Sequence, residues 1–182
     1  MDFSAQYEKG QTYHDFLERY GTDEHRQRWQ AFYDGVALDN DQQSLLMSFV
    51  REMKVLVLAG TWCGDCVNQC PILERICEAS PKIGVRYLDR DDNPELTEIL
   101  SVNGGHRVPV TVFLSEDGYV CGRYGDRTLA KYRQMASSLT SDGESTPDEN
   151  FAEQVIQEWV NEFERYQLML RTSGRLREQH GD

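Results

Sequence analysis

Apolar residues recur every three or four positions through the first 53 residues, which is the period of an amphipathic helix. Gly21 ends the first such group, and Thr22 can cap the next, with acidic residues in its first turn. Residues 1–53 are therefore predicted to be helical. The apolar faces consist of Tyr13, Phe16, Leu17 and Tyr20, then Trp29, Phe32, Tyr33 and Val36, then Leu45, Leu46, Phe49, Val50 and Met53.

The pattern changes at residue 54, where short apolar runs begin to alternate with helical spacing. The run Lys-Val-Leu-Val-Leu-Ala at 54–59 is typical of a strand buried on both faces. A crossover helix makes the first two strands parallel, and a turn at 115–118 pairs the last two as a hairpin. The predicted fold is α/β with a mixed sheet. Strands are expected at 54–59, 83–88, 108–114 and 119–123, and helices from the cysteine-rich stretch to about 79, at 93–100 and at 126–138.

The last part of the chain begins with a polar, turn-rich linker. Thr146 and Pro147 are typical of a helix start. Beyond Ser173 and Gly174 the tail is expected to fray. The apolar face of the intervening helix is predicted to contain Phe151, Val155, Trp159, Phe163 and Tyr166.

Three segments are expected to form one compact domain. Residues 1–53 would be a helical extension packed on the core, residues 54–138 the core itself, and residues 139–182 the linker, an amphipathic helix and the tail.

Charge and composition narrow the function classes. Hydrophobic residues make up 39% and charged residues 27% of the 182 positions, and the formal net charge is −12. This charge disfavours nucleic acid and anionic membranes as partners. No apolar run approaches the roughly 18 residues of a membrane span, and the first residues do not resemble a secretory signal. Five clustered cysteines do not resemble a secreted disulfide framework, so a cytoplasmic location is expected.

Three of the five cysteines lie within the stretch 61–73, Thr-Trp-Cys-Gly-Asp-Cys-Val-Asn-Gln-Cys-Pro-Ile-Leu. Cys63 falls where a strand passes into a helix, and free N–H groups at a helix start stabilise a thiolate. Cys66, three residues later, can attack a mixed disulfide formed at Cys63. Within a βαβ unit this spacing is a strong indication of thiol–disulfide chemistry.

Several motifs in residues 50–138 resemble the thioredoxin family. They are Trp62-Cys-Gly-Asp-Cys66, which resembles WCGPC with aspartate in place of proline, Pro71 in the following helix, Asp91-Asp-Asn-Pro94, Arg107-Val-Pro-Val-Thr111, and Tyr124-Gly125. The resemblance implies a thioredoxin-like fold. It also implies that Cys63 is the exposed nucleophile and Cys66 the buried resolving thiol.

The same resemblance implies how the site is shaped. A cis Val108–Pro109 bond would present the Val108 backbone to a substrate peptide, which pairs with it as an added strand. Trp62 would shield one side of the thiols. The residues expected to shape the site or bind substrate are Trp62, Gly64, Asp65, Arg107, Val108, Pro109 and Gly125.

The sequence departs from the family pattern at the proton relay and between the thiols. The family's buried aspartate and its lysine partner are replaced by Val57 and Tyr87. This predicts either slower resolution by Cys66 or a base supplied from elsewhere, for which the sequence offers no obvious candidate. A carboxylate at Asp65 disfavours a nearby thiolate. The helix start opposes that effect. His106 and Arg107, just before Pro109, are further candidates to oppose it, and both also fit ordinary surface residues.

The remaining cysteines allow more than one interpretation. Cys70 and Cys77 fit small core residues, but Cys70 also fits an extra redox thiol that competes with Cys63 for Cys66. Cys121 is expected to be structural. A metal centre is disfavoured, because zinc or an iron–sulfur cluster takes four ligands and only three cysteines lie close together.

The leading functional hypothesis is a thioredoxin-type thiol–disulfide oxidoreductase that needs no cofactor beyond the Cys63–Cys66 pair. Its expected partners are a disulfide-containing protein or small thiol, and a separate reductase or thiol pool. The alternative is a redox-sensing or protein-binding module on the same scaffold, with slow or no turnover.

Overall fold

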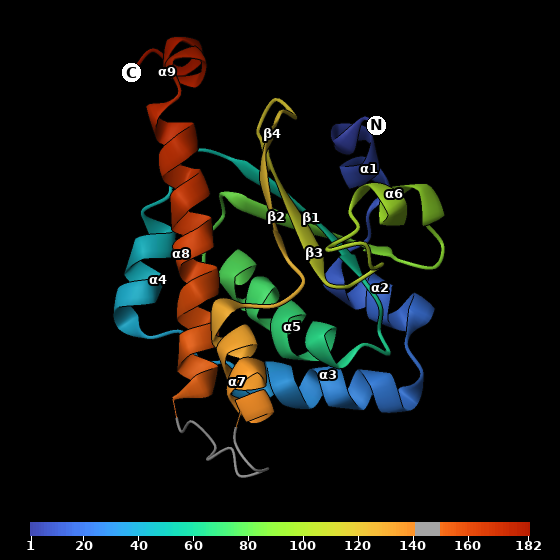
Figure 1. The fold of residues 1–182 in the computed structure, drawn as a ribbon. Coiled ribbons are helices and arrows are strands. Elements are labelled where there is room, and N and C mark those ends of the chain that lie inside the picture. Colours follow the sequence, from blue (N-terminus) through green and yellow to red (C-terminus); the bar gives the residue numbers. More distant parts are fainter. Residues whose placement is uncertain (141–149) are drawn as a thin grey trace.

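The computed structural model describes residues 1–140 and 150–182 and contains a four-stranded sheet of order β2-β1-β3-β4 (Figure 1). The central strand β1 pairs in parallel with β2 and antiparallel with β3, which forms a hairpin with β4. The predicted α/β fold with a mixed sheet is confirmed. The strands are β1 (Met53–Ala59), β2 (Ile83–Asp89), β3 (Val110–Ser115) and β4 (Val120–Gly125).

Residues 1–53 are largely helical, as the apolar spacing predicts. The predicted breaks occur at Gly21, which ends α2, and at Thr22, whose side chain caps α3. The third apolar group is only partly helical, because α4 ends at Met47 and Met53 already belongs to β1. The helices are α1 (Phe3–Lys9), α2 (Tyr13–Tyr20), α3 (Asp23–Gly35) and α4 (Asn40–Met47).

The other helices match the expected order, with one corrected start. The helix expected to open at Asp126 begins three residues later, where the carboxylate of Glu158 accepts the N–H groups of Leu129 and Ala130. The start predicted at residues 146–147 lies outside the described residues. The helices are α5 (Gly64–Glu78), α6 (Pro94–Ile99), α7 (Leu129–Thr140), α8 (Phe151–Thr172) and α9 (Gly174–His180).

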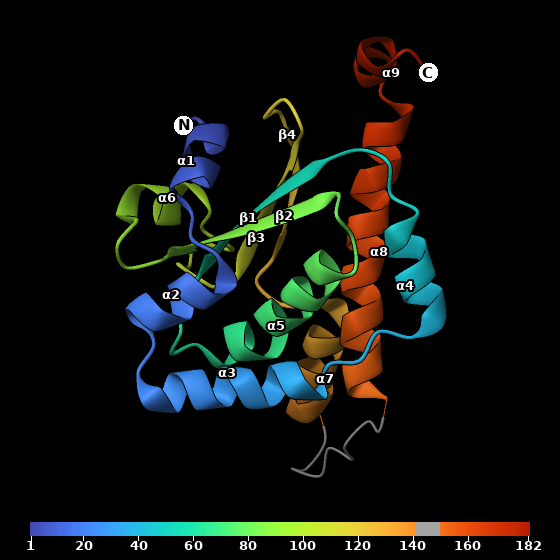
Figure 2. The ribbon, with the colours of Figure 1, turned by 180° about the vertical axis from the view of Figure 1, so that it is seen from behind.

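Helices cover the sheet from both sides. In Figures 1 and 2, α3 and α5 lie side by side below the sheet, whereas α1 and α6 lie above it. Helix α8 packs on β3 and β4, with Tyr166 stacked on Phe113 at 4.1 Å between ring centroids and Trp159 edge-on to Tyr124 at 5.0 Å. No described helix has the length and apolar character that a membrane crossing requires.

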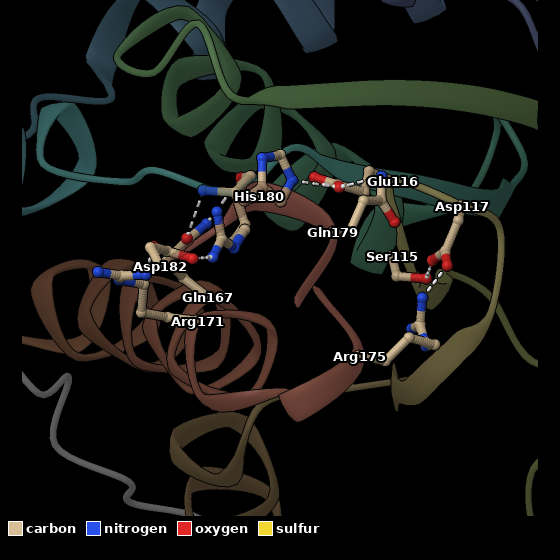
Figure 3. A network of polar contacts seen from close by, with 10 residues as sticks. Ser115, Glu116, Asp117, Gln167, Arg171, Arg175, Gln179, His180 and Asp182 are labelled. Atoms are coloured by element: carbon tan, nitrogen blue, oxygen red, sulfur yellow. Dashed lines mark hydrogen bonds and ion pairs between the residues drawn. The ribbon is translucent and has the colours of Figure 1, made fainter. Parts of the chain in front are cut away.

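The end of the chain does not fray, contrary to the sequence-based expectation. Helix α9 buries Leu176 completely. Polar contacts join this end to the β3–β4 turn and to the segment before β1 (Figure 3). They pair Arg175 with Asp117, His180 with Glu116, and Asp182 with the buried Arg51. The turn and tail are far apart in sequence, so no local pattern indicated these contacts.

Replacing Leu176 by alanine is expected to lower the free energy of unfolding by about 2–4 kcal/mol, because the change leaves a cavity beneath α9. Urea denaturation followed by circular dichroism measures the effect. The matched control is Leu168→Ala in α8, where the side chain is 54% exposed, and its effect should stay within about 0.5 kcal/mol. Equal effects for the two variants would contradict a packed α9.

Candidate redox site

Cys63 and Cys66 lie at the start of α5, directly after β1. Cys63 is the N-cap residue and is partly exposed, whereas Cys66 is fully buried one turn further on. The Cys66 side chain and partial burial raise the pKa of the Cys63 thiol, but backbone N–H groups of Cys66 and Asp65 act in the opposite direction. Burial raises the pKa of Cys66 well above its usual range. The surface thiol is therefore the one whose ionised form the helix start stabilises.

The loop before β3 lies against the Cys63 sulfur. The Cys63 thiol donates to the Val108 carbonyl at 3.3 Å, and the Val108–Pro109 peptide bond is cis. Gly125 of β4 passes so close that a Cβ there would lie 2.4 Å from the Pro109 carbonyl oxygen, and its φ is +124°. Both facts restrict the position to glycine. The structure thus brings the predicted Val108, Pro109 and Gly125 to the thiols.

Trp62 lies exposed beside the thiols. The residue is 43% exposed, and the Arg90 guanidinium lies 4.4 Å from the centroid of its ring. A Cβ at Gly60 would approach the Trp62 ring to 2.8 Å, so glycine permits this ring position. Gly64 begins α5, and a Cβ there would meet no atom within 4 Å. The structure offers no steric reason for glycine at that position.

The N-terminal helices support the segment that leads into the thiols. The Trp29 side chain in α3 donates to the Thr61 carbonyl at 2.8 Å, and Trp29 is fully buried. The Thr61 hydroxyl donates to the Tyr20 carbonyl at 3.0 Å. These two bonds hold the residue before Trp62 from the side of residues 1–53. The helices contact both the sheet and the rear of the site.

Asp65, between the two thiols, is paired with an arginine that the sequence analysis did not identify. Arg127 lies 2.8 Å from the Asp65 carboxylate, and both side chains are about four-fifths buried, with 21% and 19% exposed. The expected counter-charges are occupied elsewhere, because His106 pairs with Glu98 and Arg107 with Asp126. Arg127, rather than His106 or Arg107, is therefore the basic residue that pairs with Asp65.

Asp126 is the second residue that sequence reasoning missed. Its side chain is 3% exposed and lies 3.2 Å from both Arg107 and Arg127. Burial by itself would raise the pKa of Asp126, but hydrogen bonding from Tyr132 and the two guanidinium groups hold that pKa below its usual range. Gln69 of α5 donates to the Asp126 carbonyl at 3.0 Å. We call Asp65, Arg107, Asp126, Arg127 and Tyr132 the charge network.

The positions of the missing proton relay are buried and carry no ionised group. Val57 and Tyr87 pair across β1 and β2 and are both fully buried. Burial raises the pKa of Tyr87 well above its usual range, so its hydroxyl stays neutral, and it donates to the Cys70 carbonyl at 3.3 Å. Neither side chain therefore offers Cys66 an ionised acid–base partner at neutral pH.

The other cysteines lie in three different surroundings. Cys70 is fully buried in α5, and the Cys77 thiol donates to the Ile83 carbonyl at 3.1 Å. Cys121 is partly exposed on β4. Within residues 1–140 and 150–182, no three histidine, cysteine, aspartate or glutamate side chains are grouped as metal ligands would be.

Comparison with known proteins identifies the family. A family model described as thioredoxin matches residues 10–140, which is more than half of the chain. The chain therefore belongs to the thioredoxin family. A search of curated proteins finds no match.

Solved structures share the fold over nearly the whole chain. A Pseudomonas aeruginosa protein of unknown function has a TM-score of 0.74 and 17% identity, covering 91% of this chain and 99% of that one. A scaffold carrying an HIV epitope has a TM-score of 0.69 and 16% identity, covering 91% of this chain and 96% of that one. The likeness includes the helical segments on either side of the thioredoxin motifs.

Replacing Arg127 by glutamine should raise the pKa of the Cys63 thiol, because Asp65 would then stand unpaired beside it. The expected shift is up to about one pH unit, in keeping with one nearby charge. The pH dependence of iodoacetamide alkylation of the reduced protein measures it.

Two further variants test that interpretation. The double variant Asp65→Asn/Arg127→Gln should reverse the shift, because no unpaired carboxylate remains. Arg133→Gln, an exposed position on α7, should leave the pH profile unchanged. A single-variant shift to lower pH would contradict the role given to Arg127.

Proposed function

We propose that the protein is a thiol–disulfide oxidoreductase of the thioredoxin type. The observation that supports it best is the pair of thiols at the start of α5, one partly exposed and one fully buried, beside the Val108–Pro109 loop. Membership of the thioredoxin family agrees with a redox role.

The proposed reaction has two exchange steps. The Cys63 thiolate attacks one sulfur of a substrate disulfide, a mixed disulfide forms, and the first substrate thiolate leaves. The Cys66 thiolate then attacks the Cys63 sulfur, which releases the second substrate thiolate and leaves the Cys63–Cys66 disulfide. The substrate gains two electrons and two protons, and the two cysteines lose them.

Several neighbours of the thiols would shape the encounter. An extended substrate peptide would lie along the Val108 backbone, next to the Cys63 sulfur. Trp62 and Arg107 are exposed enough to contact it. Because Cys66 is buried, it would meet the substrate only through the mixed disulfide at Cys63.

The proposal includes the partners and location expected from the sequence. The substrate would be a disulfide in a protein or a small thiol compound, and a separate reductase or thiol pool would restore the dithiol. No cofactor beyond the two cysteines is required. A cytoplasmic location fits a cycle that depends on reducing equivalents.

A second candidate function is a redox-sensing or protein-binding module. The observation in its favour is the buried, un-ionised pair Val57 and Tyr87, which provides no base for Cys66. Such a module would exchange one disulfide and then turn over slowly or not at all.

Insulin reduction by dithiothreitol tests the leading proposal. The wild-type protein should accelerate precipitation of the insulin B chain, and Cys63→Ser should fall to the uncatalysed rate, because the attacking thiolate is lost. Cys121→Ser, on the far hairpin strand, is the matched control and should keep the wild-type rate.

The same assay separates the two functions. A wild-type rate no faster than Cys63→Ser would contradict the oxidoreductase. A single fast turnover, seen as one insulin disulfide reduced per protein without added dithiothreitol and no acceleration with it, would favour the module.

A further inference from the structure

Cys70 is a fully buried thiol that the proposed exchange cycle does not use. It lies four residues after Cys66 on α5, so the two side chains project from the same face of the helix, one turn apart. The Cys66 side chain interacts with both Cys63 and Cys70. Three thiols therefore lead from the surface into the core.

One helical hydrogen bond is missing in the turn of α5 that contains Cys66 and Cys70. A disulfide needs Cβ atoms about 3.5–4.5 Å apart, whereas residues four apart on a helix have them about 5–6 Å apart. The turn must therefore tighten by roughly 1–2 Å. Pro71 lies inside α5 and has no N–H, so the Val67 carbonyl lacks its helical partner in this same turn. That missing bond lowers the cost of the adjustment.

We propose that Cys70 is a third redox thiol, which exchanges with Cys63 for the disulfide to Cys66. The inference rests on the proposed function, because that cycle supplies the Cys63–Cys66 disulfide. The Cys70 thiolate attacks the Cys66 sulfur, the bond to Cys63 breaks, and Cys63 leaves as a thiolate. The proton lost by Cys70 is taken up by Cys63. No electrons enter or leave the protein, so the step needs no outside oxidant.

The exchange changes which sulfur atoms an outside molecule can reach. Cys66 and Cys70 are both fully buried, so a disulfide between them has no direct access to a reductase. Cys63 is the partly exposed thiol, and it is regenerated as a nucleophile. Reduction from outside would have to begin with Cys63 attacking Cys66 again. The oxidised protein would thus hold a protected disulfide and a reactive surface thiol at once.

Disulfide mapping tests this in the wild-type protein. The reduced protein is treated with hydroxyethyl disulfide, quenched in acid, and blocked with N-ethylmaleimide under denaturing conditions. The three cysteines share the tryptic peptide 55–75, in which tandem mass spectrometry locates the single maleimide. The inference expects a population labelled on Cys63, with Cys66 and Cys70 joined.

The outcomes separate this inference from the proposed function. Maleimide on Cys70 alone at every time point would overturn the third-thiol role while supporting the Cys63–Cys66 cycle. Maleimide on all three cysteines after complete reaction would contradict both.

Variants give a second readout. In oxidised Cys70→Ser, labelling of Cys63 should be lost, because its sulfur stays in the disulfide with Cys66. Cys77→Ser, two turns beyond Cys70 on the same helix, where the thiol donates to the Ile83 carbonyl, should keep Cys63 labelling at the wild-type level. The wild-type map decides the question even where Cys70→Ser fails to fold.

Discussion

Pairing of β1 on both of its edges is the constraint on which the position of the thiols depends. This strand is almost fully buried and is bonded to β2 on one side and β3 on the other. It ends at Ala59, and α5 begins five residues later, at Gly64, directly after Cys63. Hydrogen bonds from Trp29 and Thr61 hold the short connection. The thiols therefore stand at a helix start that the sheet itself locates, where backbone N–H groups favour a thiolate.

The charge near the two thiols is set by a residue distant in sequence, Arg127. An aspartate between two working thiols would oppose ionisation, yet Arg127 neutralises it at 2.8 Å. A partly exposed ion pair contributes at most about 1 kcal/mol to stability. Its larger effect is on the neighbouring thiol, where one unit of pKa corresponds to about 1.4 kcal/mol. The buried Asp126 pairs with both Arg107 and Arg127. The charge network therefore links Asp65 of α5 to the loop before β3 and to the loop after β4.

One of the two residues at the missing proton-relay positions, Tyr87, is hydrogen-bonded to the residue of the third thiol, Cys70. Val57 and Tyr87 are fully buried and stay un-ionised, and the Tyr87 hydroxyl donates to the Cys70 carbonyl. Compared with the family pattern, Cys66 lacks an acid–base partner, but it has the Cys70 thiol beside it as well as that of Cys63. In the proposed scheme the missing relay affects the first step, in which Cys66 resolves the mixed disulfide, and Cys70 acts later, on the Cys63–Cys66 disulfide that this step forms. Pro71 lies in the turn where that exchange requires movement.

Much of this protein was determined locally in the sequence. Helical spacing, the cap at Thr22, the apolar run of β1 and the hairpin turn each depend on neighbouring residues, so the mixed sheet and the motif at Cys63 were readable without coordinates. Only the tertiary structure revealed the Asp65–Arg127 pair, the buried Asp126 and the packed helix α9. Each depends on side chains brought together from distant segments. A charged residue in a loop looks the same in sequence whether it faces water or a buried partner, and only packing decides between them.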